Sequence, residues 1–168
     1  MKRDFAEWVK SPNFSFSKTR QILLVVIHAT ATKGTASPLE WLCNKNAKAS
    51  AHYLLAKDGH VYQLVSESNI AWHAGVSEWG GHKNINEISI GIELTNSNDG
   101  LDKYPEAQIT KCAYLVSQIC DTYGLYIQDV VGHVDVAPKR KTDPLGFDWD
   151  DFRMRLADLK VPSRKVNA

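Results

Sequence analysis

The chain has 168 residues, of which 43 % are hydrophobic and 23 % are charged, and its formal net charge is +1. Such a chain forms about one globular domain with a sizeable core, which excludes a disordered tail, a coiled coil and a collagen-like fibre. Because the only dense basic cluster is residues 139–141, we expect no binding to nucleic acid.

The start of the chain carries no apolar segment of the kind found in secretory signal peptides. The longest apolar run covers only residues 22–27, whereas a membrane span needs about 20 residues. We therefore expect no membrane insertion and a cytoplasmic location. The spacing of Cys43, Cys112 and Cys120 matches neither a zinc ribbon nor a redox pair, so we expect reduced, mostly buried thiols.

An N-terminal arm covers residues 1–21, where polar residues and Pro12 predict a loop with a short turn. A catalytic domain is expected over 22–160, followed by a frayed tail at 161–168. The domain begins with β-branched and leucine residues at 22–28, which predict a central strand covered on both faces.

A helix is predicted over 38–46, because Ser37 can serve as its N-cap and Pro38 suits the first helical position. Two antiparallel strands are predicted at 51–56 and 61–65, since an Asp-Gly pair between them is a strong hairpin signal. Helix and hairpin together indicate a mixed α/β chain.

A long loop without periodicity occupies 66–87, and compact domains rarely keep such a loop without a use. The strand predicted at 88–94 alternates in period two, with Ile88, Ile90, Ile92 and Leu94 on one face. Glu93 therefore projects from the other, less apolar face.

The clearest helix covers 105–123, where apolar residues recur at steps of three and four and Gly124 closes the helix. A strand at 127–132 leads directly to His133, and acidic residues at 148–151 open a last helix. The chain is thus expected to be a single α/β domain, in which helices flank a central mixed sheet of about five strands.

Two histidines, His28 and His133, directly follow apolar strands. Strand ends border the ligand crevice in open α/β sheets, although either histidine alone is more often a structural residue. The loop at 132–144 also carries lysine and aspartate. Two imidazoles and one carboxylate, with a fourth position left to water, would form a catalytic zinc site at the strand ends.

Five strings occur in an order that resembles the type 2 N-acetylmuramoyl-L-alanine amidases: residues 26–30, 50–54 with 58–59, 71–75, 89–94 and 132–144. These zinc enzymes cut between the lactyl group of muramic acid and L-alanine. The Arg-Lys-Thr-Asp-Pro string is most similar to the anhydromuropeptide-amidase branch. Leu145 departs from that branch, which often has glycine after this proline.

The resemblance implies that His28, His133 and Asp143 bind Zn²⁺, and that Glu93 is the general base. The strand pattern agrees for Glu93, because it is the only ionisable residue of an otherwise apolar strand. Lys141 is expected to stabilise the oxyanion. The alternatives are a solvated strand residue for Glu93 and an exposed loop residue for Lys141.

Four further residues are candidates for substrate binding: His73, Trp72, His52 and Asn84. Each has a structural alternative. His73 can instead form structural hydrogen bonds, and His52 can be a core residue. Trp72 can attach its loop to the core rather than stack on a sugar, and Asn84 can cap a turn.

The function expected from the sequence is zinc-dependent hydrolysis of the N-acetylmuramoyl-L-alanine bond in peptidoglycan or muropeptides by a monomer. Endolysin action on the cell wall, after release through a holin, is the first reading. The alternatives are a cytoplasmic amidase that recycles soluble anhydromuropeptides and a peptidoglycan-binding module without activity.

Overall fold

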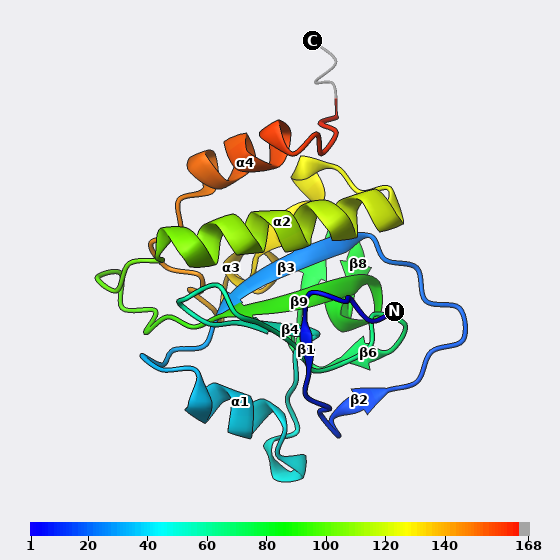
Figure 1. Ribbon diagram of the computed structural model, residues 1–168. Helices are drawn as coiled ribbons and strands as arrows, with labels where there is room; N and C mark the ends of the chain where they lie inside the picture. The colour runs from blue at the N-terminus through cyan, green and yellow to red at the C-terminus, as the bar shows by residue number, and fades with distance from the viewer. Residues whose placement is uncertain (165–168) are drawn as a thin grey trace.

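Six strands form the principal sheet in a computed structural model that describes residues 1–164. In spatial order they are β1 (Glu7–Trp8), β5 (Val61–Gln63), β4 (Tyr53–Leu55), β9 (Ser89–Leu94), β3 (Leu24–Ala29) and β10 (Val130–Gly132). All neighbours are parallel except β4 and β5, which form the predicted antiparallel hairpin. The sheet is therefore mixed, as expected, with β9 and β3 near its middle (Figure 1).

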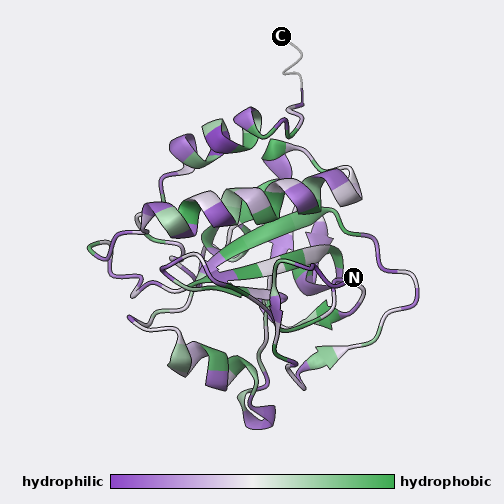
Figure 2. Ribbon diagram, in the orientation of Figure 1, coloured by the Kyte–Doolittle hydropathy of each residue, from purple (hydrophilic) through white to green (hydrophobic). Residues whose placement is uncertain are grey.

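One face of the sheet is covered by α2 (Glu106–Tyr123), and α4 (Trp149–Asp158) lies outside α2 (Figure 1). Ile90, Ile92 and Leu94 of β9 pack into the core cluster on this side, together with buried residues of α2. The period-two pattern is thereby confirmed for these three residues. Ile88, expected on the same face, lies in the 3-10 turn before β9 and packs against a separate apolar cluster. In Figure 2 the central strands are mainly hydrophobic, whereas α4 carries many hydrophilic residues.

The other face of the sheet is covered by short elements and loops. A smaller apolar cluster lies there and includes Leu24, Val26 and Ala74. The short elements are β2 (Phe14–Ser15), α1 (Ala36–Leu42), η1 (Lys45–Ala47), β6 (Ile70–Ala71), β7 (Glu78–Trp79), β8 (His82–Lys83), η2 (Ile85–Ile88) and α3 (His133–Val136). The remaining short element, η3 (Ile127–Asp129), packs instead into the main core cluster beside α4.

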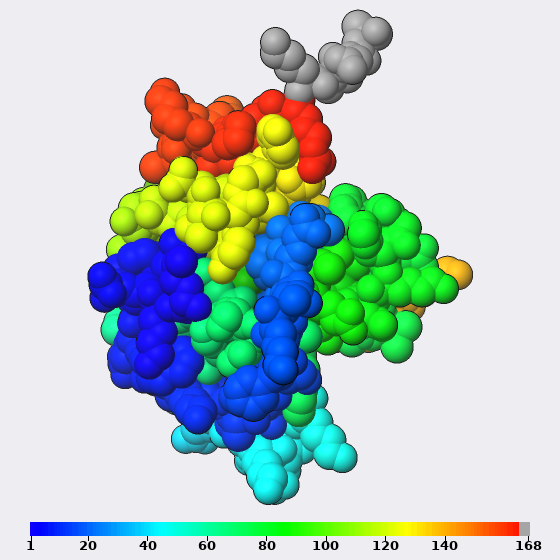
Figure 3. Space-filling model, turned by 90° about the vertical axis from the view of Figure 1, so that its right-hand side faces the viewer, coloured from blue at the N-terminus to red at the C-terminus, as the bar shows by residue number. Residues whose placement is uncertain are grey.

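The N-terminal arm is more ordered than the expected loop and turn. It contributes β1 to the edge of the principal sheet and β2 to a two-stranded sheet with β6. Arg3 forms a buried ion pair with Glu67, whose carboxylate also accepts hydrogen bonds from Tyr53 and Tyr123. These long-range contacts hold the arm, drawn in blue in Figure 3, against the body of the protein.

Several element boundaries differ from the sequence prediction, and the helix predicted to end at residue 46 ends at Leu42. Helix α1 begins at Ala36 after Thr35, so the prediction of Ser37 as its N-cap was wrong. The strand predicted at 127–132 begins as the 3-10 turn η3, because Asp129 accepts the backbone N–H of Tyr126 there.

The predicted tail is packed where it is described. Val161 is buried, and Pro162 accepts the backbone N–H of Ile127; residues 165–168 lie outside the described residues. The cysteines are unpaired in the described chain, with Cys112 and Cys120 buried, as predicted. Within residues 1–164, no helix has both the length and the apolarity needed to cross a membrane.

Candidate active site

The parallel register of β3 and β9 places the first two candidate residues side by side. His28 pairs with Glu93, and Val26 pairs with Gly91. Since successive side chains alternate across a strand, His28, Glu93 and Gly91 share the face opposite α2. His133 begins α3 directly after β10, the other neighbour of β3.

Three predicted ligands from separate elements meet at one point. Nδ1 of His28 lies 2.9 Å from Nδ1 of His133, and Oδ2 of Asp143 lies 3.1 Å from the latter and 3.5 Å from the former. All three residues are buried. The backbone N–H of Val134 donates to the carbonyl of Asp143, which holds the loop of Asp143 beside α3.

The donor set fits a zinc ion. Ligand atoms about 2.0–2.1 Å from a tetrahedral zinc stand about 3.3 Å from one another, and the three observed separations bracket this spacing. Two imidazole nitrogens and one carboxylate oxygen are ligands that zinc accepts in catalytic sites. Burial lowers the pKa of His28 to about 4, so this imidazole is neutral and can act as a ligand.

Glu93 borders the same site with an unusual carboxylate. Its Oε2 is buried and has no hydrogen-bond partner among residues 1–164. Burial raises the pKa of Glu93 to about 8; the charge of Asp143 adds to this rise and Lys141 opposes it. A carboxylate whose pKa lies near neutrality is suited to accept and release protons.

A pocket of about 510 Å³ opens beside the cluster. Glu93, Lys141, His133 and Asp143 all line it, whereas Trp41 belongs to the lining contributed by α1. The structure thus brings the predicted base, the predicted cation and two of the predicted ligands to one cavity.

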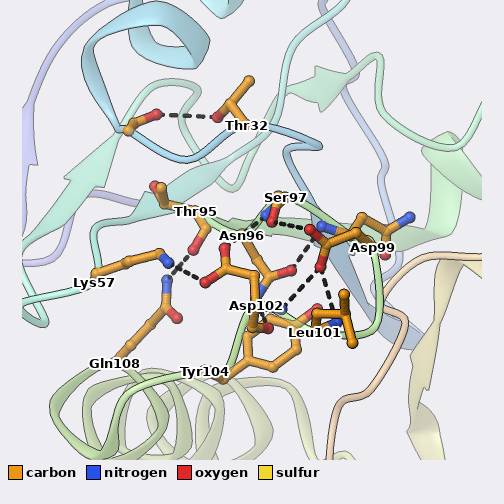
Figure 4. Close-up of polar contacts among 12 residues, drawn as sticks. Thr32, Lys57, Thr95, Asn96, Ser97, Asp99, Leu101, Asp102, Tyr104 and Gln108 are labelled. Atoms are coloured by element: carbon orange, nitrogen blue, oxygen red, sulfur yellow. Dashed lines mark hydrogen bonds and ion pairs between the residues drawn. The ribbon is translucent and has the colours of Figure 1, made fainter.

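The loop after β9 forms part of the pocket wall and is fixed by its own polar side chains (Figure 4). Asp102 accepts the backbone N–H of Ser97 and forms an ion pair with Lys57. Asn98 donates to Thr142 and accepts the backbone N–H of Leu145. Asn98 therefore joins this wall to the loop of Asp143. The contact is made at Leu145, the residue at which the sequence departs from the anhydromuropeptide-amidase branch.

Two candidate substrate residues from the long loop reach the pocket. Trp72 lines it, but its indole N–H also donates to Ser15 of β2, which attaches the loop to the N-terminal arm. His73 lines it as well, yet its Nδ1 lies 2.9 Å from Nε2 of His28. Burial and the neighbouring His28 lower the pKa of His73 well below its usual value.

Two other candidates lie away from the pocket, and the prediction that they bind substrate is corrected. His52 is fully buried; its Nδ1 accepts the backbone N–H of Gly91, and its Nε2 lies 3.1 Å from the carbonyl of Asn69. It is a core residue. Asn84 adopts a left-handed conformation and precedes η2, where its carbonyl accepts the N–H of Glu87.

Sequence reasoning missed two residues that hold the long loop in place. Asn86 accepts the backbone N–H groups of His73 and Ala74. Arg140 donates to the carbonyls of Ala74 and Val76. Their partners are backbone atoms of another part of the chain, so the sequence does not show this role, although Arg140 belongs to the Arg-Lys-Thr-Asp-Pro string.

Residues 18–146 match the family described as N-acetylmuramoyl-L-alanine amidase. The chain is 42 % identical over 113 residues to the 1,6-anhydro-N-acetylmuramyl-L-alanine amidase AmpD of Escherichia coli, over 66 % of this chain and 60 % of that relative. The chain thus spans about 60 % of the length of this curated relative.

Two solved structures are similar in fold. A selenomethionine AmpD derivative has a TM-score of 0.80 at 29 % identity, covering 94 % of this chain and 96 % of that one. AmiD from E. coli has a TM-score of 0.75 at 34 % identity, covering 88 % of this chain and 60 % of that one. The AmiD structure is a complex with the substrate anhydro-N-acetylmuramic acid-L-Ala-D-γ-Glu-L-Lys.

Proposed function

Because the chain belongs to the N-acetylmuramoyl-L-alanine amidase family, we propose that it hydrolyses the amide bond between the lactyl group of N-acetylmuramic acid and L-alanine. The convergence of His28, His133 and Asp143 beside Glu93 carries this proposal. A binding module without activity would need neither an acceptor set suited to a metal nor a buried carboxylate with a raised pKa.

The proposed substrate is a soluble anhydromuropeptide. Support comes from the name of the AmpD relative and from the anhydro-sugar peptide bound in the AmiD complex. These observations favour the recycling alternative over the endolysin that was the first reading of the sequence. The fixed wall loop near Leu145 gives the pocket a defined rim against which a small substrate can be oriented.

The chemistry is divided among a few side chains. Zn²⁺ held by His28, His133 and Asp143 would polarise the scissile carbonyl and make water more acidic. The Glu93 carboxylate accepts a proton from the attacking water and donates it to the leaving alanine nitrogen. The ammonium group of Lys141 stabilises the negative charge that develops on the carbonyl oxygen.

The decisive experiment compares soluble anhydromuropeptide with intact sacculi, using mass spectrometry to measure the free stem peptide. We expect release from the soluble fragment and little from sacculi. Glu93→Ala should retain zinc but lower the rate on the order of 10²–10⁴-fold. If the protein solubilises sacculi, the endolysin hypothesis is supported instead. If the parent protein binds muropeptide but releases no stem peptide, it is a binding module.

Metal content gives a separate check on the ligand set. The parent protein should retain about one zinc per chain after dialysis, and Asp143→Ala should lose it, since a catalytic zinc site keeps three protein ligands. Zinc retention by the variant would exclude Asp143 as a ligand. The predicted monomer and cytoplasmic location stay predictions; light scattering and cell fractionation test them.

A further inference from the structure

The segment His73–Ala74 contacts both imidazole ligands on the side away from the metal position. Nε2 of His28 lies 2.9 Å from Nδ1 of His73, and Nε2 of His133 lies 3.2 Å from the carbonyl oxygen of Ala74. We propose that this segment is a positioning element, which fixes the protons of both ligands on Nε2 so that both Nδ1 lone pairs face the ion. The inference rests on the proposed zinc amidase function.

The proton positions can be assigned from a backbone carbonyl outward. The Ser89 hydroxyl lies 2.6 Å from the carbonyl oxygen of Ile85, which only accepts hydrogen bonds, so the hydroxyl proton is donated there. The oxygen of Ser89 is then left as an acceptor toward Nε2 of His73, 3.1 Å away. His73 therefore carries its proton on Nε2.

The assignment continues to the first ligand. A neutral His73 with its proton on Nε2 presents a lone pair at Nδ1, so Nε2 of His28 must donate to it. The proton of His28 is thereby held away from Nδ1. The direction of each hydrogen bond is therefore fixed along the series from Ile85 through Ser89 and His73 to His28.

The second ligand is assigned by one bond. Nε2 of His133 donates to the carbonyl of Ala74, so Nδ1 is the nitrogen that can present a lone pair to the cluster. Two lone pairs and the carboxylate of Asp143 then face one another without a proton between them. Three acceptors at this spacing repel each other unless a cation lies among them, so the segment prepares the site for a metal.

The segment is itself held from several directions. Asn86 accepts both of its backbone N–H groups, and Arg140 donates to the carbonyl of Ala74 at 2.9 Å. Gly91 provides the space for the imidazole of His73, because a Cβ there would lie 2.3 Å from Cγ of His73. Ser89 and Gly91 thus form the seat of this ring on β9.

The first test removes the hydroxyl that sets the direction of the chain. Ser89→Ala should weaken zinc binding about 10–100-fold, measured by competition with a chelator. Ser117→Ala is the matched control, since its hydroxyl also donates to a backbone carbonyl, that of Tyr114, in α2. Equal zinc affinity in the two variants would overturn the proposal.

The second test separates positioning from packing. His73→Ala should weaken zinc binding and alter the absorption spectrum of the cobalt-substituted protein. His73→Asn should restore most of both, because an amide oxygen can accept the hydrogen bond from Nε2 of His28. If the asparagine variant behaves like the alanine variant, the hydrogen bond to His28 is not what matters.

The third test uses the unmodified protein, so it does not depend on variants that fold. Nitrogen-15 NMR of the metal-free chain should show His28, His73 and His133 protonated at Nε2; a proton at Nδ1 of His28 would overturn the assignment. Zinc affinity and tautomers are measured without turnover. If they behave as expected while no muropeptide is cleaved, the proposed function fails and the positioning role stands.

Discussion

The two faces of the central sheet differ although the same strands form both. On the face toward α2, Ile90, Ile92 and Leu94 are fully buried in the main core cluster. On the opposite face, Ser89, Gly91 and Glu93 alternate with them along β9; Ser89 and Gly91 contact His73, and Glu93 lines the pocket beside the candidate metal centre. One strand thus supplies stability through its even positions and chemistry through its odd ones, so changes at adjacent residues should have separable effects.

A large effect is expected at Lys141, which lines the pocket on the polar side of the sheet. Lys141→Met should lower kcat about 10²–10³-fold, because it removes one stabilising group from the oxyanion. Lys139→Met, in the same loop but exposed, should change kcat little. Turnover of soluble anhydromuropeptide measures both, and equal rates in the two variants would remove Lys141 from this role.

The apolar face is tested at Ile92, which is fully buried. Ile92→Ala should lower the free energy of unfolding by about 2–5 kcal/mol, because it leaves a cavity against the main core. Met154→Ala, at an exposed position of α4, should stay within about 0.5 kcal/mol. Urea denaturation measures these free energies. If the Kd for zinc is unchanged by Ile92→Ala, the two faces act independently; a large shift in this Kd would contradict that.

Gly91 lies on the polar face of β9, directly against the imidazole of His73. Gly91→Ala directs a methyl group into the imidazole of His73, so overpacking should cost about 1–3 kcal/mol of stability and should also weaken zinc binding. Gly34→Ala is the matched control, since its Cβ would meet no atom of residues 1–164 within 4 Å. If the Gly91 variant binds zinc as tightly as the parent, the position of His73 does not affect zinc binding.

The smallest effect concerns pH in the metal-free protein. The pKa of Glu93 is raised in the folded state to about 8, so between pH 5 and pH 8 the unfolded chain binds fewer protons and stability falls as pH rises. Glu93→Gln should remove this loss, so the variant should be more stable than the parent at pH 8 and its stability should depend less on pH. Parallel stability curves for the two proteins would mean that Glu93 is not held in a poorly solvated site.

Much of the candidate site followed from local pattern. Strand β9 alternates strictly, so its polar face and Glu93 could be assigned before any pairing was known. The resemblance selected His28, His133 and Asp143, and these residues converge. His52 was misjudged as a substrate residue, because a histidine in a short apolar strand looks the same in sequence whether it faces a pocket or the core.

The sequence by itself determined the α/β class and the amphipathic helix α2, because these depend on periodicity along neighbouring residues, and its resemblance to a family selected the residues of the candidate metal centre. Only the tertiary structure decided that the arm adds a strand, that Asn86 and Arg140 hold the long loop, and that His73 contacts His28. Those contacts join backbone and side-chain atoms far apart along the chain, and the folding of the whole sheet fixes their distances.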